Sequence, residues 1–183
     1  MNERRLVAPI AAALGAAAVG AAVAGQSFYG GDGSGVEIKY DDAQWEATEL
    51  GSYPYFSCIA SDCDATTCLV ITSLNPDFAK WPETADKASL AALDGIFLEY
   101  QKSGGDSDAE IVEPTSVSAI GGRDTLVSVI RYNMAGGGFL SSKYMFRDAN
   151  DTRIVTCEGD EKSITASKVR IETLVGAIHF TPQ

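Results

Sequence analysis

Two segments of the chain place apolar residues at steps of three and four positions, the spacing of one buried face on an α-helix. They span residues 84–102 and 163–180. Their apolar positions are Leu90, Leu93, Phe97 and Tyr100 in the first, and Ile171, Leu174, Val175 and Ile178 in the second. We therefore expect two amphipathic helices, each with one face packed against a sheet.

Stretches that read as strands surround these helices. Residues 36–49 form the first stretch, with a break at Asp41-Asp42, and residues 55–59 and 67–72 form a hairpin. Four more stretches follow the first helix, at 110–117, 124–133, 139–147 and 153–157. Short turns join these four, which predicts an antiparallel meander, because parallel strands need long crossovers. The order predicts an α+β domain: a mostly antiparallel β-sheet flanked by two main helices.

This order resembles the Mog1/PsbP-like family of α/β/α sandwiches. The features that carry the resemblance are a Gly-Gly-Arg turn at residues 121–123, the long hairpin after it, and a terminal helix ending in Ala177-Ile178-His179-Phe180. It runs from residue 84 to residue 180 and is a matter of topology. The resemblance implies an accessory subunit, an adaptor or a chaperone, often in an exported compartment and generally not an enzyme.

The first 24 residues are typical of a secretory signal peptide. Arg4 and Arg5 precede an uncharged, Ala-rich stretch that ends in Ala22-Val23-Ala24, a small-x-small cleavage pattern. We expect cleavage after Ala24 and a periplasmic or secreted protein, with retention as a membrane anchor as the alternative. Five glycines among residues 25–35 then predict a flexible leader, and residues 36–183 a single domain.

Four cysteines in an exported chain predict two disulfides, with three connectivities open. They are Cys58, Cys63, Cys68 and Cys157. Folding the predicted hairpin about Cys63 brings Cys58 opposite Cys68 and leaves Cys63 to reach Cys157. We therefore expect Cys58–Cys68 and Cys63–Cys157, and the other two pairings remain open. A zinc site is disfavoured, because the spacing lacks the usual C-x2-C pair.

The chain is acidic, with 14 Lys and Arg against 25 Asp and Glu and a formal net charge of −11. Nucleic acid and anionic lipid are themselves densely negative, so such a protein repels both. We therefore expect no nucleic-acid partner and no stable insertion into a membrane once the signal peptide is removed. A protein partner is expected instead.

Few residues offer catalytic chemistry. The one histidine, His179, falls at the end of the predicted last helix, where we expect it to pack or to cap the helix. We assign no catalytic residue and expect no cofactor. Asp106, Asp108 and Glu110 alternate along a loop and can point at one hard cation, which makes them a candidate calcium site.

Aromatic residues gather around the predicted cysteine hairpin. Tyr53 and Tyr55 share one face of their strand, while Phe56 and Cys58 share the other. One face belongs to the core; the second, where exposed, forms a recognition patch with Trp81. Burial of both faces is the alternative, and the pattern favours it.

These observations favour an exported, non-enzymatic interaction or accessory module that binds a protein partner in the cell envelope. Two alternatives remain open. One is a domain that binds a cation or a small ligand, and the other is a hydrolase that uses paired carboxylates.

Overall fold

A computed structural model of the chain describes residues 25–30, 35–63, 65–71, 81–106, 108–134, 137–148 and 151–180. The predicted signal peptide lies outside the described residues. The elements in chain order are β1 (Gln26–Gly30), β2 (Val36–Asp41), β3 (Trp45–Leu50), β4 (Tyr53–Cys58), β5 (Thr67–Ile71), α1 (Lys87–Ser103), β6 (Glu110–Ile120), β7 (Arg123–Met134), β8 (Gly137–Asp148), β9 (Asp151–Asp160), α2 (Glu161–Gly176) and β10 (Ile178–Phe180).

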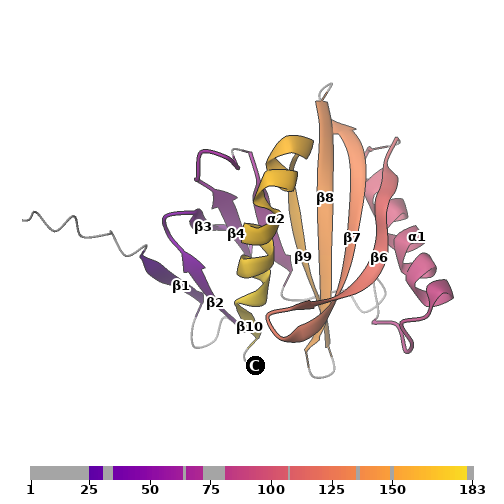
Figure 1. Cartoon of the computed structure of the whole chain (residues 1–183), viewed down its shortest axis with the longest axis horizontal. Coiled ribbons are helices and arrows are strands. Elements are labelled where there is room, and N and C mark those ends of the chain that lie inside the picture. The colour runs from indigo at the N-terminus through magenta and orange to yellow at the C-terminus, as the bar shows by residue number, and fades with distance from the viewer. Residues whose placement is uncertain are drawn as a thin grey trace, which may run out of the picture.

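The strands form two sheets whose neighbouring strands are all antiparallel (Figure 1). The larger sheet has the order β3-β4-β5-β9-β8-β7-β6, and the smaller has the order β1-β2-β10. The meander β6–β9 that short turns predict is therefore present. It joins the earlier meander β3–β5 through the pairing of β5 with β9. The expected architecture, an antiparallel sheet flanked by two helices, is confirmed.

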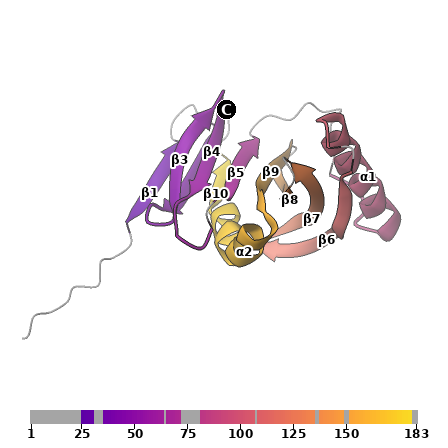
Figure 2. The same ribbon diagram turned by 90° about the horizontal axis from the view of Figure 1, so that it is seen from above.

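The two helices pack on different sides of strands β6–β9 (Figure 2). Alternation along β7 shows why both sides need cover: Leu126 and Ile130 point toward α1, whereas Val127 and Val129 point toward α2. All four side chains are buried. Burying each aliphatic side chain stabilises the fold by roughly 1.5–3 kcal/mol, and this gain draws both helices onto the sheet.

The core on the α2 side is the larger of the two. The three-stranded sheet adds Val36, Ile38 and Ile178 to it, so this sheet and α2 together cover one face of the seven-stranded sheet. The core on the α1 side has fewer buried members, among them Leu93 and Phe97 of α1.

Helix α1 begins three residues later than the pattern predicts, and α2 begins two residues earlier. In each case an aspartate before the first turn sets the start. Asp86 Oδ1 accepts hydrogen bonds from the backbone N–H groups of Ala88 and Ser89, both at 2.9 Å. Asp160 Oδ1 accepts one from the N–H of Ser163 at 3.0 Å.

The last predicted helix is too long at its C-terminal end. Helix α2 stops at Gly176, and Ile178–Phe180 form β10, which pairs with β2. Ile178 is buried in either arrangement, so helical spacing did not distinguish them. His179 is on β10, opposite Glu37 of β2, and is exposed. The expectation that His179 packs or caps a helix is therefore wrong, because its side chain alternates away from the core.

Gly176 ends α2 beside the β6–β7 turn. Gly121 and Gly122 form that two-residue turn with φ of 61° and 78°, values that L side chains rarely adopt. A Cβ on Gly121 would collide with the backbone of Gly176. Arg123, next in the chain, donates hydrogen bonds to the carbonyls of Val175 at 2.7 Å and Ile178 at 2.8 Å. The Gly-Gly-Arg turn thus fixes the end of α2 against the sheet.

The glycine-rich leader is partly a strand, which corrects the expectation that it has no structure. Gln26–Gly30 pair with β2 as β1. Aromatic packing explains this: the Tyr29 ring meets Phe56 edge-on with centroids 6.0 Å apart, and its hydroxyl donates to Glu49 at 2.9 Å. Burial and the neighbouring Glu49 carboxylate raise the pKa of Tyr29 to about 12.

The disulfides are Cys58–Cys63 and Cys68–Cys157, so the expected pairing is wrong. The β4–β5 register places Cys68 opposite Phe56 instead of Cys58. The next strand pair places Cys68 directly opposite Cys157. Sequence spacing alone does not reveal that β5 and β9 are neighbours, because their cysteines are 89 residues apart.

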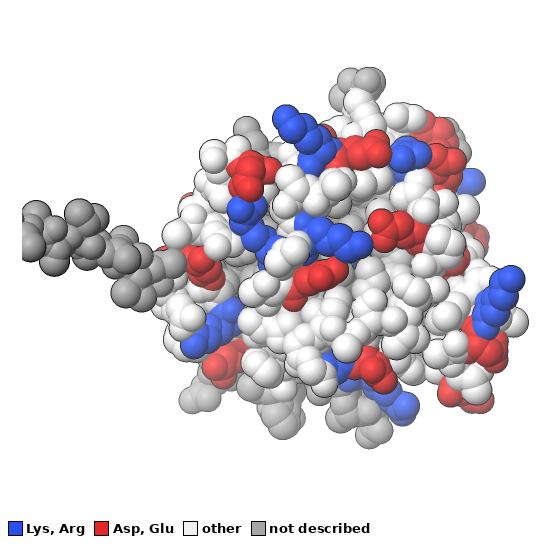
Figure 3. Space-filling view, in the orientation of Figure 1, with Lys and Arg blue, Asp and Glu red and all other residues white. Residues whose placement is uncertain are grey.

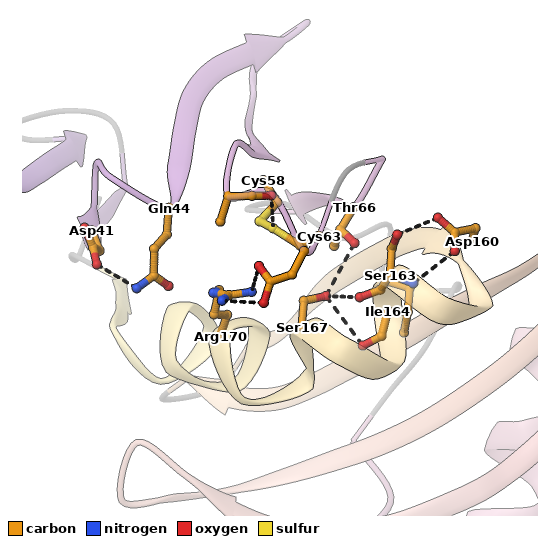
Figure 4. The surroundings of a disulfide bond; sticks show 12 residues. Asp41, Gln44, Cys58, Cys63, Thr66, Asp160, Ser163, Ile164, Ser167 and Arg170 are labelled. Atoms are coloured by element: carbon orange, nitrogen blue, oxygen red, sulfur yellow. Dashed lines mark hydrogen bonds and ion pairs between the residues drawn. A yellow bond between two sulfur atoms is a disulfide. The ribbon is translucent and has the colours of Figure 1, made fainter.

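The short Cys58–Cys63 bridge fastens the loop that contacts α2 (Figure 4). Asp62 in this loop forms an ion pair with Arg170 at 2.8 Å, and the Arg170 guanidinium lowers the pKa of the Asp62 carboxyl. Thr66 Oγ1 lies 3.4 Å from Ser167 Oγ. The bridge therefore holds this loop in a position where its polar side chains contact those of α2.

Candidate functional site

A groove opens where α1 ends above the seven-stranded sheet. Its volume is about 490 Å³, within the roughly 300–1,000 Å³ range of ligand pockets. Helix α1 and the loop after it form one wall, and strands β3, β4, β5, β9 and β8 form the rest. The groove is lined by Leu50, Tyr55, Thr67, Leu69, Ile71, Tyr100, Gln101, Ser103, Gly104, Asp106, Lys143, Thr156 and Glu158.

Strand register sets the order of side chains across the groove floor. Tyr55 pairs with Leu69, Leu69 with Thr156, and Thr156 with Lys143, so the four cross the sheet in one row. The row changes from apolar over β4 and β5 to polar over β9 and β8. We call the first part the apolar end of the groove and the second part its polar end.

Lys143 is the most buried charged residue of the polar end. Only 4% of Lys143 is exposed, and its Nζ lies 3.8 Å from Oε1 of Glu158. The same oxygen accepts a hydrogen bond from Ser141 Oγ at 2.8 Å. Burial lowers the pKa of Lys143, and the Glu158 carboxylate opposes that effect. The Glu158 side chain is 39% exposed, so the carboxylate reaches solvent from the pair.

The end of α1 supplies the opposite wall of the polar end. Gln101 is buried, and its Nε2 donates to Asp106 Oδ2 at 2.8 Å. The predicted apolar stripe of this helix ends in Tyr100, but the structure gives the buried position to Gln101. Tyr100 instead stands at the rim of the groove with 54% of its surface exposed.

The carboxylates of the polar end also affect the phenol of Tyr132. Burial raises the pKa of Tyr132, and the nearby carboxylates of Glu158 and Asp106 raise it further. Both carboxylates disfavour a second negative charge at this place. The shift indicates that both carboxylates lie close to the phenol of Tyr132, which is itself outside the lining of the groove.

Of the three aromatic residues proposed as a recognition patch, Tyr55 is the one that lines the groove. Tyr53 and Tyr55 share the half-buried face of β4, while Phe56 and Cys58 lie buried on its other face. Tyr55 lines the groove, and Tyr53 is outside its lining. Trp81 is half-buried and packs against both cores. Recognition by these residues stays a prediction, with Tyr55 the member placed at the groove.

The three loop carboxylates proposed as a calcium site each have a separate partner. Asp106 accepts from Gln101, Asp108 accepts from Asn133, and Glu110 forms an ion pair with Arg131 at 3.1 Å. In the part of the chain that the structure describes, no three carboxylate, histidine or cysteine side chains form a metal-binding group. Calcium binding stays a prediction.

Sequence reasoning missed Lys143 and Glu158. The signal in the sequence was that Lys143 lies within a predicted strand, on the same face as Ser141 and Met145. In the structure Met145 is fully buried, so this face of β8 points into the protein, and the Lys143 side chain points the same way. A lysine on the inward face of a central strand is rare enough to mark a site.

Comparison with known proteins gives a likeness in fold. The structure of cyanobacterial PsbP (CyanoP) from Synechocystis sp. PCC 6803 matches with a TM-score of 0.55 and 11% identity, covering 88% of this chain and 96% of that one. A structure from Bacteroides thetaiotaomicron matches with a TM-score of 0.52 and 13% identity, covering 87% of this chain and 50% of that one. The chain therefore has the PsbP/Mog1-like fold that the resemblance predicted.

No model of a protein family matches the sequence, and no curated protein matches it either. A fold of this kind hosts many activities, so the residues of the groove are the features that indicate a function here. Neither described helix has the length and apolarity needed to cross a membrane.

Proposed function

We propose that this protein is an extracytoplasmic, non-enzymatic accessory module that binds a partner protein through the groove. One observation carries the proposal: large apolar side chains remain exposed at the rim of a sizeable cavity. Leu50 is 57% exposed and Tyr100 is 54% exposed, and both line the groove. Exposed apolar groups next to a cavity are typical of binding surfaces.

The position of these two residues favours a protein over a small molecule. A small ligand would fill the groove floor and leave the outer surfaces of Leu50 and Tyr100 in water. A protein segment seated in the groove would also cover its rim. Interfaces commonly bury about 800 Å² on each partner, which extends well beyond one cavity.

The other face of the molecule offers a contrast. Figure 3 shows acidic and basic side chains interspersed over the face that carries α2. Two of the ion pairs of α2 are Lys168–Glu113 at 3.5 Å and Arg170–Asp62 at 2.8 Å. We therefore place the partner on the α1 side of the sheet.

Two buried disulfides support the extracytoplasmic location, because such bridges form and persist in oxidising compartments. The predicted signal peptide agrees. Intact mass of the native protein, before and after reduction and alkylation, tests both points. We expect the mass of a chain that begins at residue 25 and has no free thiol. A full-length chain with four alkylatable thiols would contradict the location.

Site-specific photocrosslinking in the producing cells tests the partner. A photoreactive amino acid at Leu50 or Tyr100 should yield one discrete adduct with the same polypeptide. The matched control is Val169, which is 77% exposed on α2. The captured protein should then bind purified wild-type protein and bind Leu69→Arg at least tenfold more weakly. Equal crosslinking at Val169, or full binding to Leu69→Arg, would contradict the proposal.

A further inference from the structure

We infer that the partner segment places a basic side chain, Lys or Arg, at the polar end of the groove, with apolar residues beside it. The inference rests on the proposed function and names the chemistry of its partner. It follows from which charges of the polar end face solvent and which do not.

The charged residues of the lining are Asp106, Lys143 and Glu158. The one ammonium among them is the most deeply buried, with 5% of the Lys143 side chain exposed against 39% for Glu158. Asp106 is half-buried. A ligand in the groove therefore meets two carboxylates before it meets the ammonium, and the contact surface is acidic.

The end of α1 contributes its helix dipole. The last turn of an α-helix carries a partial negative charge, although here the carbonyls of Tyr100, Gln101 and Lys102 accept hydrogen bonds from the N–H groups that follow the helix. The ammonium of Lys102 belongs to the same turn, but this residue is exposed and lies outside the lining of the groove. Ser103 and Gly104 of this end line the groove, and so does Asp106, two residues after Gly104. The raised pKa of Tyr132, caused in part by Glu158 and Asp106, is a second sign of the same field.

Lys143 prepares Glu158 for such a ligand without neutralising it fully. Its Nζ is 3.8 Å from Glu158 Oε1, longer than a direct charge-assisted hydrogen bond, while Ser141 Oγ donates to the same oxygen at 2.8 Å. These contacts fix one carboxylate oxygen in place. A carboxylate held in this way loses little freedom when a cation binds.

The apolar end accounts for the rest of the ligand. Tyr55, Leu69 and Ile71 lie beside the polar end on adjacent strands. Lys and Arg side chains have long aliphatic stems that pack on apolar surface while the charged head reaches a polar partner. The row from Tyr55 to Lys143 offers both surfaces in that order. The net charge of −11 also favours the approach of a basic segment.

Peptide display against the purified, oxidised protein tests the inference. A random peptide library is selected on wild-type protein, and dissociation constants of enriched peptides are measured on variants. We expect enriched peptides to carry Lys or Arg beside aliphatic or aromatic residues. Glu158→Gln and Asp106→Asn should each weaken binding about tenfold. Glu37→Gln, the same charge change at an exposed position on β2, should leave the affinity unchanged.

Replacing the basic residue of the peptide by norleucine provides a double-mutant cycle. The norleucine peptide should bind wild-type protein and Glu158→Gln equally, because the interaction that distinguishes them is gone. Thermal unfolding of each variant, with its disulfides intact, confirms that the fold is retained. Equal losses from Glu37→Gln and Glu158→Gln would reduce the effect to net charge and overturn the inference.

The outcomes also separate this inference from the proposed function. Enriched peptides that lose affinity for Leu69→Arg but show no preference for a basic residue would overturn the inference alone. Peptides that bind Leu69→Arg as well as wild type lie outside the groove and would contradict both. Failure to enrich any peptide that depends on the groove would also count against both.

Discussion

The two faces of the seven-stranded sheet differ in how completely they are covered. On the α2 side, a helix and a second sheet cover the strands, and both disulfides are buried there. On the α1 side, one helix packs against strands β6–β9, and beside its end the groove stays open over β4, β5 and parts of β9 and β8. The first face therefore carries the larger buried core, and the second carries the groove that we propose as the binding surface.

The largest expected effect is loss of the long disulfide on the covered face. Replacing Cys68 and Cys157 by alanine should lower the free energy of unfolding by about 4 kcal/mol, because the bridge closes a long loop. The matched pair is Cys58 and Cys63, whose five-residue separation predicts a loss of about 2 kcal/mol. Urea unfolding of both double variants measures the difference. Equal losses would show that loop length does not determine how much each disulfide adds to the free energy of unfolding.

The next effect concerns the turn that fixes the end of α2. Gly121→Ala should cost about 3 kcal/mol, because its Cβ meets the Gly176 backbone and its φ is positive. Gly122→Ala has the same positive φ but open space around it and should cost about 1 kcal/mol. Thermal unfolding compares the two. A smaller loss for Gly121→Ala than for Gly122→Ala would contradict the close approach.

Two neighbours on β5 test the comparison of faces directly. Val70 is fully buried on the α2 side, and Leu69 is half-buried in the groove. Val70→Ala should lower stability by about 2 kcal/mol and leave partner binding unchanged. Leu69→Ala removes more carbon atoms but should cost about 1 kcal/mol of stability while weakening binding. The reverse ranking in urea unfolding would overturn the division of roles.

The smallest expected effect is at Lys143. Lys143→Met should change the free energy of unfolding at pH 7 by less than about 1 kcal/mol, because lost ion pairing is offset by relief of buried charge. The depressed pKa of Lys143 in the folded state means that the unfolded chain binds more protons, so this residue makes stability rise toward pH 10. The variant should lose that rise. An unchanged pH profile between pH 7 and 10 would contradict the burial of the ammonium.

Local patterns predicted the elements of the central meander because neighbouring strands there are also neighbours in sequence. Strand β7 needs only its own alternation and the adjacent Gly121-Gly122 turn to be recognised. The alternation along β4 also grouped Tyr53 with Tyr55 and Phe56 with Cys58, but it did not say which group is buried. The resemblance in topology, which runs from residue 84 to residue 180, extended these local predictions to the arrangement of the meander and the two helices.

Long-range pairings were the main failures. Strand β5 pairs with β9, and β2 pairs with β10, although the members of each pair are far apart in the sequence. No local sequence pattern indicates either pairing. The disulfide pairing and the position of His179 were wrong for this reason. The groove shares this origin: Tyr55 was a candidate from its own strand, but Lys143 and Glu158 meet it only through the β5–β9 pairing.

The bond between Cys68 and Cys157 has a consequence for the order of events in biosynthesis. A polypeptide is made from its N-terminus, so Cys58 and Cys63 emerge nearly together, whereas Cys68 precedes its partner by 89 residues. Until β9 appears, Cys68 is an unpaired thiol on a half-finished sheet, with two other cysteines close by. The native bond must therefore form late. Until β9 appears, Cys68 has to stay reduced, or any non-native disulfide that it forms has to be broken by thiol–disulfide exchange.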